Sequence, residues 1–142
     1  MSNFSAFMKS NKKQRKNELY AATKSLTDEN GVPLLWELRA ITTRENEAIR
    51  DECTTEVQVP GKPGMYRPRV DTSEYQAKLM AAAVVMPNLN DAELQDSYGV
   101  MSPEELLKEM LDNAGEYADL AIKVQQISGF TSLAEDVETA KN

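Results

Sequence analysis

After residue 41 the sequence contains four predicted helix N-termini, and they constrain its fold more than any other feature. Each pairs an oxygen-bearing N-cap residue with a glutamate three positions later, a spacing that satisfies free N–H groups of the first helical turn. Proline at the first helical position strengthens the last start, at Pro103. The predicted pairs are Thr42 with Glu45, Asp71 with Glu74, Asn90 with Glu93, and Ser102 with Glu105.

Apolar residues recur at helical spacing over residues 72–86, 103–112 and 116–128. The first of these stripes is expected to end with Met86 on its buried side. Gly99 and Gly129 stand where left-handed helix C-caps are favoured. The apolar residues that follow them, Val100 and Phe130, are expected to pack back on the helices that end there, against Leu94 and Val124.

Before the helices, the sequence predicts a β-hairpin. Residues 18–26 and 32–41 flank the pair Asn30-Gly31, which is a strong turn signal. A lone hairpin is only marginally stable in water, so this one is expected to pack on the helices. In its second run the residues predicted to face the core are Leu34, Trp36, Leu38 and Ala40, which alternate with Leu35, Glu37, Arg39 and Ile41.

Residues 57–70 contain three prolines and two glycines and are therefore predicted as a loop, at most an irregular ribbon with Val57 and Val59 facing inward. The predicted fold class is α+β and predominantly helical, with an N-terminal β-hairpin packed on about four to five short helices. The predicted organisation is a basic flexible arm at 1–17, a single globular domain at 18–130, and a polar C-terminal tail at 131–142 that frays.

Composition narrows the functional classes. The 142 residues suit one domain, and 41% of them are hydrophobic. There is no apolar run near the ~20 residues of a membrane span and no signal-peptide pattern at the N-terminus, so we expect a cytosolic protein. A single cysteine, Cys53, rules out an internal disulfide and is expected to be a buried small hydrophobe beside Ile49.

The sequence contains no histidine. This absence excludes the Ser–His and Cys–His nucleophile pairs and most zinc sites. Residues 88–96 are rich in oxygen ligands, but Ala92 and Leu94 break the alternation that a calcium loop needs, and a helix dipole accounts for the acids there. The turn at 61–64 lacks the ending of a phosphate-binding loop. We predict no catalytic residue, no cofactor and no metal.

Charge is distributed unevenly. Residues 1–17 contain five basic side chains and no acidic one, whereas residues 71–142 contain four basic and fourteen acidic ones. The arm can dock on a protein, remain solvated or contact nucleic acid, and the acidic body disfavours nucleic acid. Docking would place an apolar face in a groove, with lysines meeting acidic neighbours. The candidate partner contacts are Phe4, Phe7 and Met8, at helical spacing, with Lys12 and Lys13.

Several segments resemble one known family. They are KKQRKNELYAATKSL, DENG, LLWELRAITTREN and, above all, MPNLNDAELQDSYGV with the following SPEELL. In the same order, and over most of residues 11–130, they are similar to the XkdN-like tail assembly chaperones of long-tailed phages and prophages. The run PNLNDAELQDSYG is the most specific of these signals.

The resemblance implies a chaperone without catalytic activity in the cytoplasm of a bacterial host. Its expected partners are the tape-measure protein, which it would keep soluble, and the tail-tube protein, whose subunits it would help to add. The resemblance supplies no binding residues. The alternative is a structural tail or baseplate subunit that stays in the virion. From the charge asymmetry, we also expect self-association in which the basic arm docks on the acidic C-terminal half of a neighbour.

Overall fold

The structure, a computed structural model, describes residues 3–130. Within this range it has two short 3-10 turns, five strands and five α-helices, which agrees with the predicted α+β class and its N-terminal hairpin. The elements are the turns Ser5–Phe7 and Lys9–Asn11, the strands β1 (Glu18–Tyr20), β2 (Trp36–Leu38), β3 (Thr54–Gln58), β4 (Tyr66–Val70) and β5 (Val84–Met86), and the helices α1 (Thr43–Glu52), α2 (Thr72–Ala83), α3 (Ala92–Tyr98), α4 (Pro103–Met110) and α5 (Ala114–Ile127).

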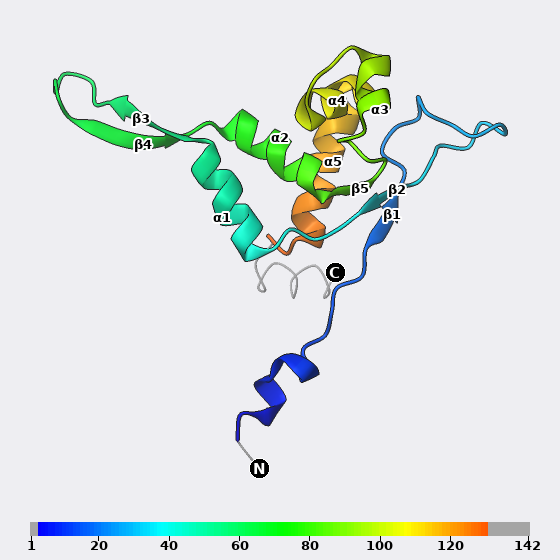
Figure 1. Ribbon diagram of the computed structural model, residues 1–142, viewed down its shortest axis with the longest axis horizontal. Helices are drawn as coiled ribbons and strands as arrows, with labels where there is room; N and C mark the ends of the chain where they lie inside the picture. Colours follow the sequence, from blue (N-terminus) through cyan, green and yellow to red (C-terminus); the bar gives the residue numbers. More distant parts are fainter. Residues whose placement is uncertain (1–2, 131–142) are drawn as a thin grey trace, which may run out of the picture.

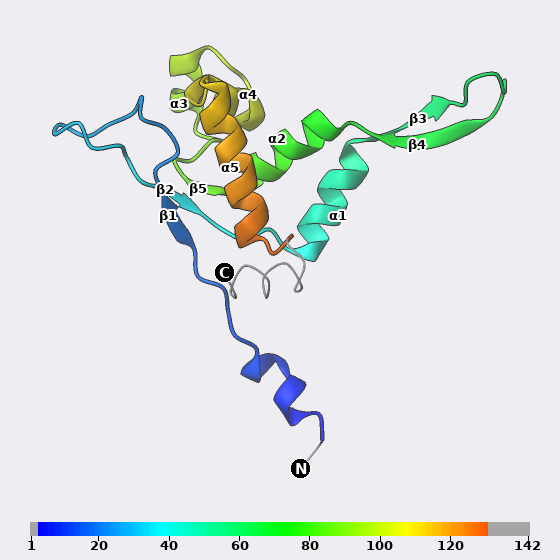
Figure 2. The same cartoon turned by 180° about the vertical axis from the view of Figure 1, so that it is seen from behind.

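The helices and a three-stranded sheet, in the order β1-β2-β5, make up the body of the molecule. Three segments leave this body (Figures 1 and 2). The N-terminal arm extends away from one end, the distal half of the first hairpin leaves one side, and the two-stranded β3–β4 ribbon leaves the opposite side. The largest fully buried side chains are Trp36, Leu38, Met80, Leu106, Leu107, Leu120, Val124 and Cys53.

The first hairpin forms as predicted near its base but not toward its tip. β1 pairs antiparallel with β2, and Trp36 and Leu38 are buried, as predicted. Leu34 is 45% exposed and Ala40 half-buried, whereas Ile41 from the alternate set is buried. The distal half projects past the helices, so alternation there has no core to face (Figure 1).

Strand β5 replaces the last turn of a predicted helix. Helix α2 ends at Ala83, and the next three residues pair with β2 on its other edge. Val84 and Val85 are β-branched, and Pro87 disfavours a helical conformation for the residue before it. The prediction of a helix to residue 86 is therefore wrong, and Met86 is exposed rather than on a buried stripe.

Residues 54–70 form a regular antiparallel ribbon where a loop was predicted. Five residue pairs run from Thr54 with Val70 to Gln58 with Tyr66. Pro68 is tolerated because β4 has an open edge, where no ladder hydrogen bond needs its missing N–H. Val57 and Val59 are half-buried, and neither belongs to the hydrophobic core cluster.

The predicted helix starts at residues 42, 71 and 102 are confirmed. Thr42 forms a reciprocal capping box with Glu45, while Asp71 and Ser102 each accept a hydrogen bond from the backbone N–H three residues on. The prediction that Asn90 caps a helix is wrong by one residue, because the Asp91 side chain accepts from Leu94 N at 2.8 Å.

Helix α5 begins at Ala114, two residues before the predicted start, because the Asn113 side chain accepts from the N–H groups of Gly115 and Glu116. Gly99 adopts the predicted left-handed conformation, with φ at 69°, and Val100 packs against the core. Phe130 remains 48% exposed and is not part of the hydrophobic core cluster. The predicted tail, residues 131–142, lies outside the described residues.

Candidate partner-binding surfaces

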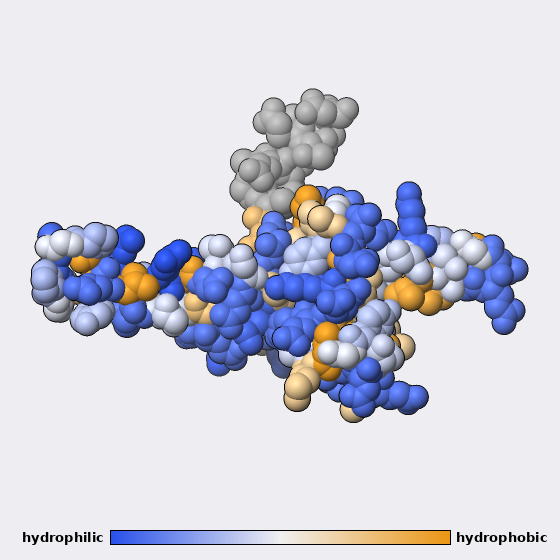
Figure 3. All heavy atoms as spheres, turned by 90° about the horizontal axis from the view of Figure 1, so that it is seen from above, coloured by the Kyte–Doolittle hydropathy of each residue, from blue (hydrophilic) through white to orange (hydrophobic). Residues whose placement is uncertain are grey.

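Exposed apolar side chains concentrate on the three segments that leave the body. Eight of the thirteen large hydrophobic residues exposed in the described range lie on the arm, the distal half of the first hairpin or the ribbon. Figure 3 shows hydrophobic side chains among hydrophilic ones on the two lateral projections. The eight residues are Phe4, Phe7, Met8, Val32, Leu34, Leu35, Met65 and Tyr66.

The arm places its predicted apolar contacts in solvent. Phe4 is 71% exposed, Phe7 84% and Met8 52%. Phe7 ends a 3-10 turn that Phe4 and Met8 flank, so the three do not lie on a turn of α-helix. At the root of the arm, Arg15 Nη1 lies 3.4 Å from the carbonyl oxygen of Ile127, at the end of α5. A cation there is favoured by the helix dipole, so the root is fixed while the apolar tip extends away.

Lys12 and Lys13, the predicted charged contacts, line a cavity of about 550 Å³ between the arm and the body. Lys9 and Arg15 contribute further positive charge, whereas the charge of Arg39 is paired with Glu45, and no acidic side chain lines the cavity in the described part of the chain. The structure thus brings both predicted lysines to one strongly basic hollow.

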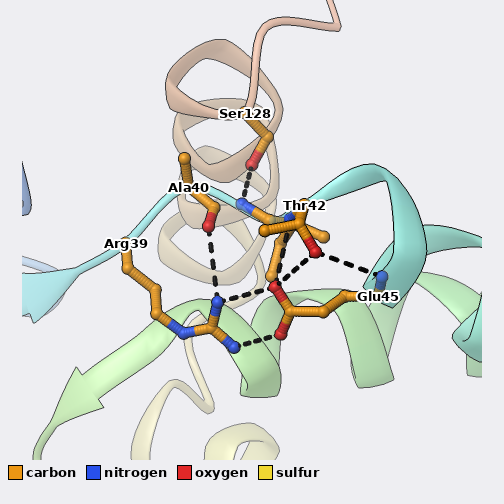
Figure 4. A network of polar contacts seen from close by, with 6 residues as sticks. Arg39, Ala40, Thr42, Glu45 and Ser128 are labelled. Atoms are coloured by element: carbon orange, nitrogen blue, oxygen red, sulfur yellow. Dashed lines mark hydrogen bonds and ion pairs between the residues drawn. The ribbon is translucent and has the colours of Figure 1, made fainter. Parts of the chain in front are cut away.

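A polar network fixes the floor of this hollow (Figure 4). Arg39 Nη1 donates to Glu45 Oε1 at 2.8 Å, and the second guanidinium nitrogen donates to the other carboxylate oxygen. Glu45 also accepts from the backbone N–H of Thr42 at 3.1 Å, and Ile41 N donates to Ser128 Oγ at 2.9 Å. Hydrogen bonds from Arg39, and to a lesser extent from Thr42, lower the pKa of Glu45 to about 2.

The base of the first hairpin is attached to α5. Thr23 Oγ1 and Lys24 N donate to the two carboxylate oxygens of Glu116, each at 2.8 Å. These bonds lower the pKa of Glu116, with the backbone N–H of Lys24 as the main cause. An ion pair of 2.8 Å between Lys123 and Glu18 holds β1 to the same helix. The hairpin is therefore fixed at its base while its distal half projects.

The outer face of the sheet adds exposed apolar side chains, with Glu37 between them, to this hairpin. The register places Leu19 opposite Glu37, and Glu37 opposite Met86, so these three side chains share one face. Leu19 and Met86 are both exposed, and Leu35 lies two residues before Glu37 on the same side. Sequence reasoning missed this surface because it did not place β5 beside β2.

The described residues form neither a metal site nor a membrane-spanning helix. Between residues 3 and 130, no group of three or more cysteine, aspartate or glutamate side chains is arranged to hold a metal ion. No helix in this range is long and apolar enough to cross a membrane. Burial raises the pKa of the Cys53 thiol, and this residue is buried at the end of α1, as predicted.

A small α+β body with projecting hydrophobic segments defines the structural class of this molecule. The chain belongs to the phage XkdN-like tail assembly chaperone family, whose model matches residues 4–141. This finding confirms the resemblance seen in the sequence. A tail assembly chaperone has phage tail proteins as its general class of partner, and that role is a non-enzymatic one.

Two proteins of Bacillus subtilis (strain 168) are similar to this chain. The protein YqbN is 30% identical over 118 residues, which are 83% of this chain and 78% of YqbN. The phage-like element PBSX protein XkdN is 30% identical over 121 residues, which are 84% of this chain and 80% of XkdN. The crystal structure of YqbN superposes with a TM-score of 0.76 at 24% identity, covering 92% of this chain and 99% of that one, and so shows the same fold.

Proposed function

We propose that this protein binds the tape-measure protein in the cytoplasm of a bacterial host, keeps it soluble, and assists addition of tail-tube subunits around it, without catalysis. The observation that supports this most is the concentration of exposed apolar side chains on segments that leave the body. Such side chains do not stabilise the body itself, so their exposure calls for an apolar partner.

A tape-measure protein suits these surfaces chemically. It is expected to be a very long helical chain, and its apolar stripes would face water until the tube encloses them. Segments that project in three directions can follow such a stripe over a longer distance than a compact face can. The net charge of −7 would keep a coated complex dispersed.

The arm is the proposed primary contact. Phe4, Phe7 and Met8 would meet an apolar stripe of the partner, while Lys12 and Lys13 would meet acidic residues beside it. Methionine is unbranched and adaptable, which suits a partner surface that varies along its length.

Co-expression with the tape-measure protein tests the proposal. We expect the partner to become soluble and to co-purify with the wild-type chain. Phe4→Ser with Phe7→Ser should reduce recovery of the partner severalfold. Met101→Ser with Ile122→Ser is the matched control, because it removes two exposed apolar side chains from the body, and it should leave recovery unchanged.

A partner that stays insoluble and unbound beside the wild-type chain would overturn the proposal. Mass spectrometry of purified particles separates the chaperone from a structural tail or baseplate subunit. A chaperone should be absent from mature particles, whereas a structural subunit should be present in a fixed ratio to the tube protein.

A further inference from the structure

The ribbon, residues 54–70, has little to stabilise it within one chain. It leaves the body between α1 and α2, and none of its residues belongs to the core cluster or packs against it (Figures 1 and 2). A two-stranded ribbon alone is marginally stable in water. Its root is fixed by a 2.8 Å hydrogen bond from Asp71 N to Cys53 O, which closes the segment where it joins the helices. The exposed part of the ribbon beyond this root is therefore available to bind a partner.

One face of the ribbon combines apolar and cationic side chains. The ladder pairs Thr55 with Arg69 and Val57 with Arg67, and a 2.8 Å bond from Val59 N to Met65 O extends it by one pair. Strand alternation places these six side chains together, and we call them the arginine face. Each arginine stands opposite a residue without negative charge, and neither makes a salt bridge within residues 3–130.

The open edge of the ribbon is a poorer recognition surface than this face. Pro68 lies in the middle of β4 and lacks the N–H that an added strand would need. Pro60 and Pro63 occupy the connection between the two strands. Recognition through side chains is therefore favoured over pairing with a third strand.

A groove of matching chemistry lies on the body, where α1, α2 and α4 meet. Its volume is about 220 Å³, and we call it the acidic groove. Lys78 Nζ lies 3.7 Å from a carboxylate oxygen of Glu52 and equally far from one of Glu104, so both carboxylates keep oxygens available to further donors. The apolar residues that line the groove are Ile49, Ala81, Ala82 and Pro103.

The two surfaces belong to one chain but do not meet within it, because the ribbon points away from the body (Figure 1). Their charges are complementary: the arginine face has two arginines and no acidic side chain, whereas the groove is lined by two carboxylates, of Glu52 and Glu104, and one lysine, Lys78. In a two-fold dimer each such contact occurs twice, since each copy supplies both surfaces.

We propose that the arginine face binds the acidic groove of a second copy of this chain, so that two copies exchange ribbons reciprocally. Val59 and Met65 contact the apolar floor of the groove, and Arg67 and Arg69 bind Glu52 and Glu104 of the neighbour.

Sedimentation velocity of the full chain over a range of protein concentrations tests this proposal. The wild-type chain should show a concentration-dependent dimer that salt weakens, because part of the contact is ionic. Arg67→Glu with Arg69→Glu should raise the dimer dissociation constant about tenfold or more. Lys24→Glu with Arg44→Glu is the matched control, because it changes the net charge equally at exposed positions outside both surfaces, and it should leave dimerisation unchanged.

Charge exchange separates a direct contact from an indirect effect on folding. Glu52→Lys with Glu104→Lys should weaken the dimer as the arginine variant does, and the two sets combined should restore it at least in part. Circular dichroism confirms that each variant is folded. A chain that is monomeric at every concentration, or combined variants that show no recovery, would overturn the proposal. Association that is lost on deleting the arm but is unaffected by the ribbon variants would overturn it too.

Discussion

The ribbon is inserted in the chain between two helices of the body, but the ribbon and the body are stabilised in different ways. The body buries large apolar side chains from helices and sheet, and side-chain caps fix where its helices begin. The ribbon has its ladder of cross-strand pairs, the hydrogen bonds of its connecting turn and those at its root. In the body, most apolar residues are needed for folding, whereas the exposed side chains of the ribbon are free to serve recognition.

The first hairpin combines a part that is buried in the core with a part that is exposed. Its base contributes Trp36 and Leu38 to the core and is attached to α5 through Glu116. Its distal half exposes Val32, Leu34 and Leu35. The same kind of hydrophobic residue is therefore buried where the hairpin lies against the helices and exposed where it projects past them. Its position relative to the helices decides whether it stabilises the fold or is available for binding.

Leu38→Ala should give the largest loss of stability, because its side chain is 0% exposed in the central strand. We expect the free energy of unfolding to fall by about 3 kcal/mol. Leu35→Ala in the same segment should change it by no more than about 0.5 kcal/mol. Urea denaturation of both variants compares the two, and similar losses would contradict the division between buried base and exposed tip.

Glu45→Gln should lower the free energy of unfolding at pH 7 by about 1–2 kcal/mol, a value reduced for solvent screening because the side chain is 32% exposed. Folding depresses the pKa of Glu45 from 4.5 to about 2, so its stabilisation is present above pH 4.5 and is lost as the pH falls through 2. The difference between wild type and variant should therefore shrink over that window.

Denaturation of both proteins at several pH values measures this difference. Glu47→Gln, at an exposed position on α1, is the charge-matched control and should have little effect. A difference that does not change between pH 7 and pH 2 would show that the Arg39–Glu45 pair contributes no ionic stabilisation.

Asp91→Ala should lower the free energy of unfolding by about 1 kcal/mol, because the helix α3 loses its N-cap. Asn90→Ala should change it by only a few tenths of that amount, since Asn90 is exposed and its side chain does not cap the helix. Thermal denaturation of the two variants distinguishes the observed cap from the one that the sequence predicted. A larger loss for the Asn90 variant would place the cap one residue earlier.

Replacing residues 56–68 with Asn-Gly should have the smallest effect on stability. The pair Thr55–Arg69 would then be closed by a two-residue turn, and the core would be untouched. We expect a change of no more than about 0.5 kcal/mol in the free energy of unfolding. A loss above about 2 kcal/mol would show that the ribbon belongs to the cooperative unit of the body.

Features set by a few neighbouring residues could be predicted from the sequence. The caps at Thr42, Asp71 and Ser102 depend on a spacing of three residues, and the burial of Trp36 and Leu38 depends on alternation beside a turn. The start of α5 shows the same signal, Asn113 followed by Glu116, and could have been found with the rule used for the others.

Features that depend on tertiary contacts were missed. The run of valines before Met86 suits a helix or a strand, and only the free edge of β2 decides between them. The prolines of the ribbon suggested a loop, but Pro68 is accommodated at an open edge, and Pro60 and Pro63 lie in the connection between the strands. Of the candidate site, the sequence singled out Phe4, Phe7 and Met8, which are exposed, and their role as partner contacts stays a prediction. The basic hollow could not be found from the sequence, because the fold brings Arg39 beside the arm.

The junction between ribbon and helices has a mechanical consequence. Cys53 ends α1 and is followed at once by β3, while β4 leads directly to Asp71, the cap of α2. No slack connection separates the ribbon from the two helices. A force that a partner exerts on the ribbon would therefore be transmitted directly to α1 and α2, and would strain the packing between these two helices.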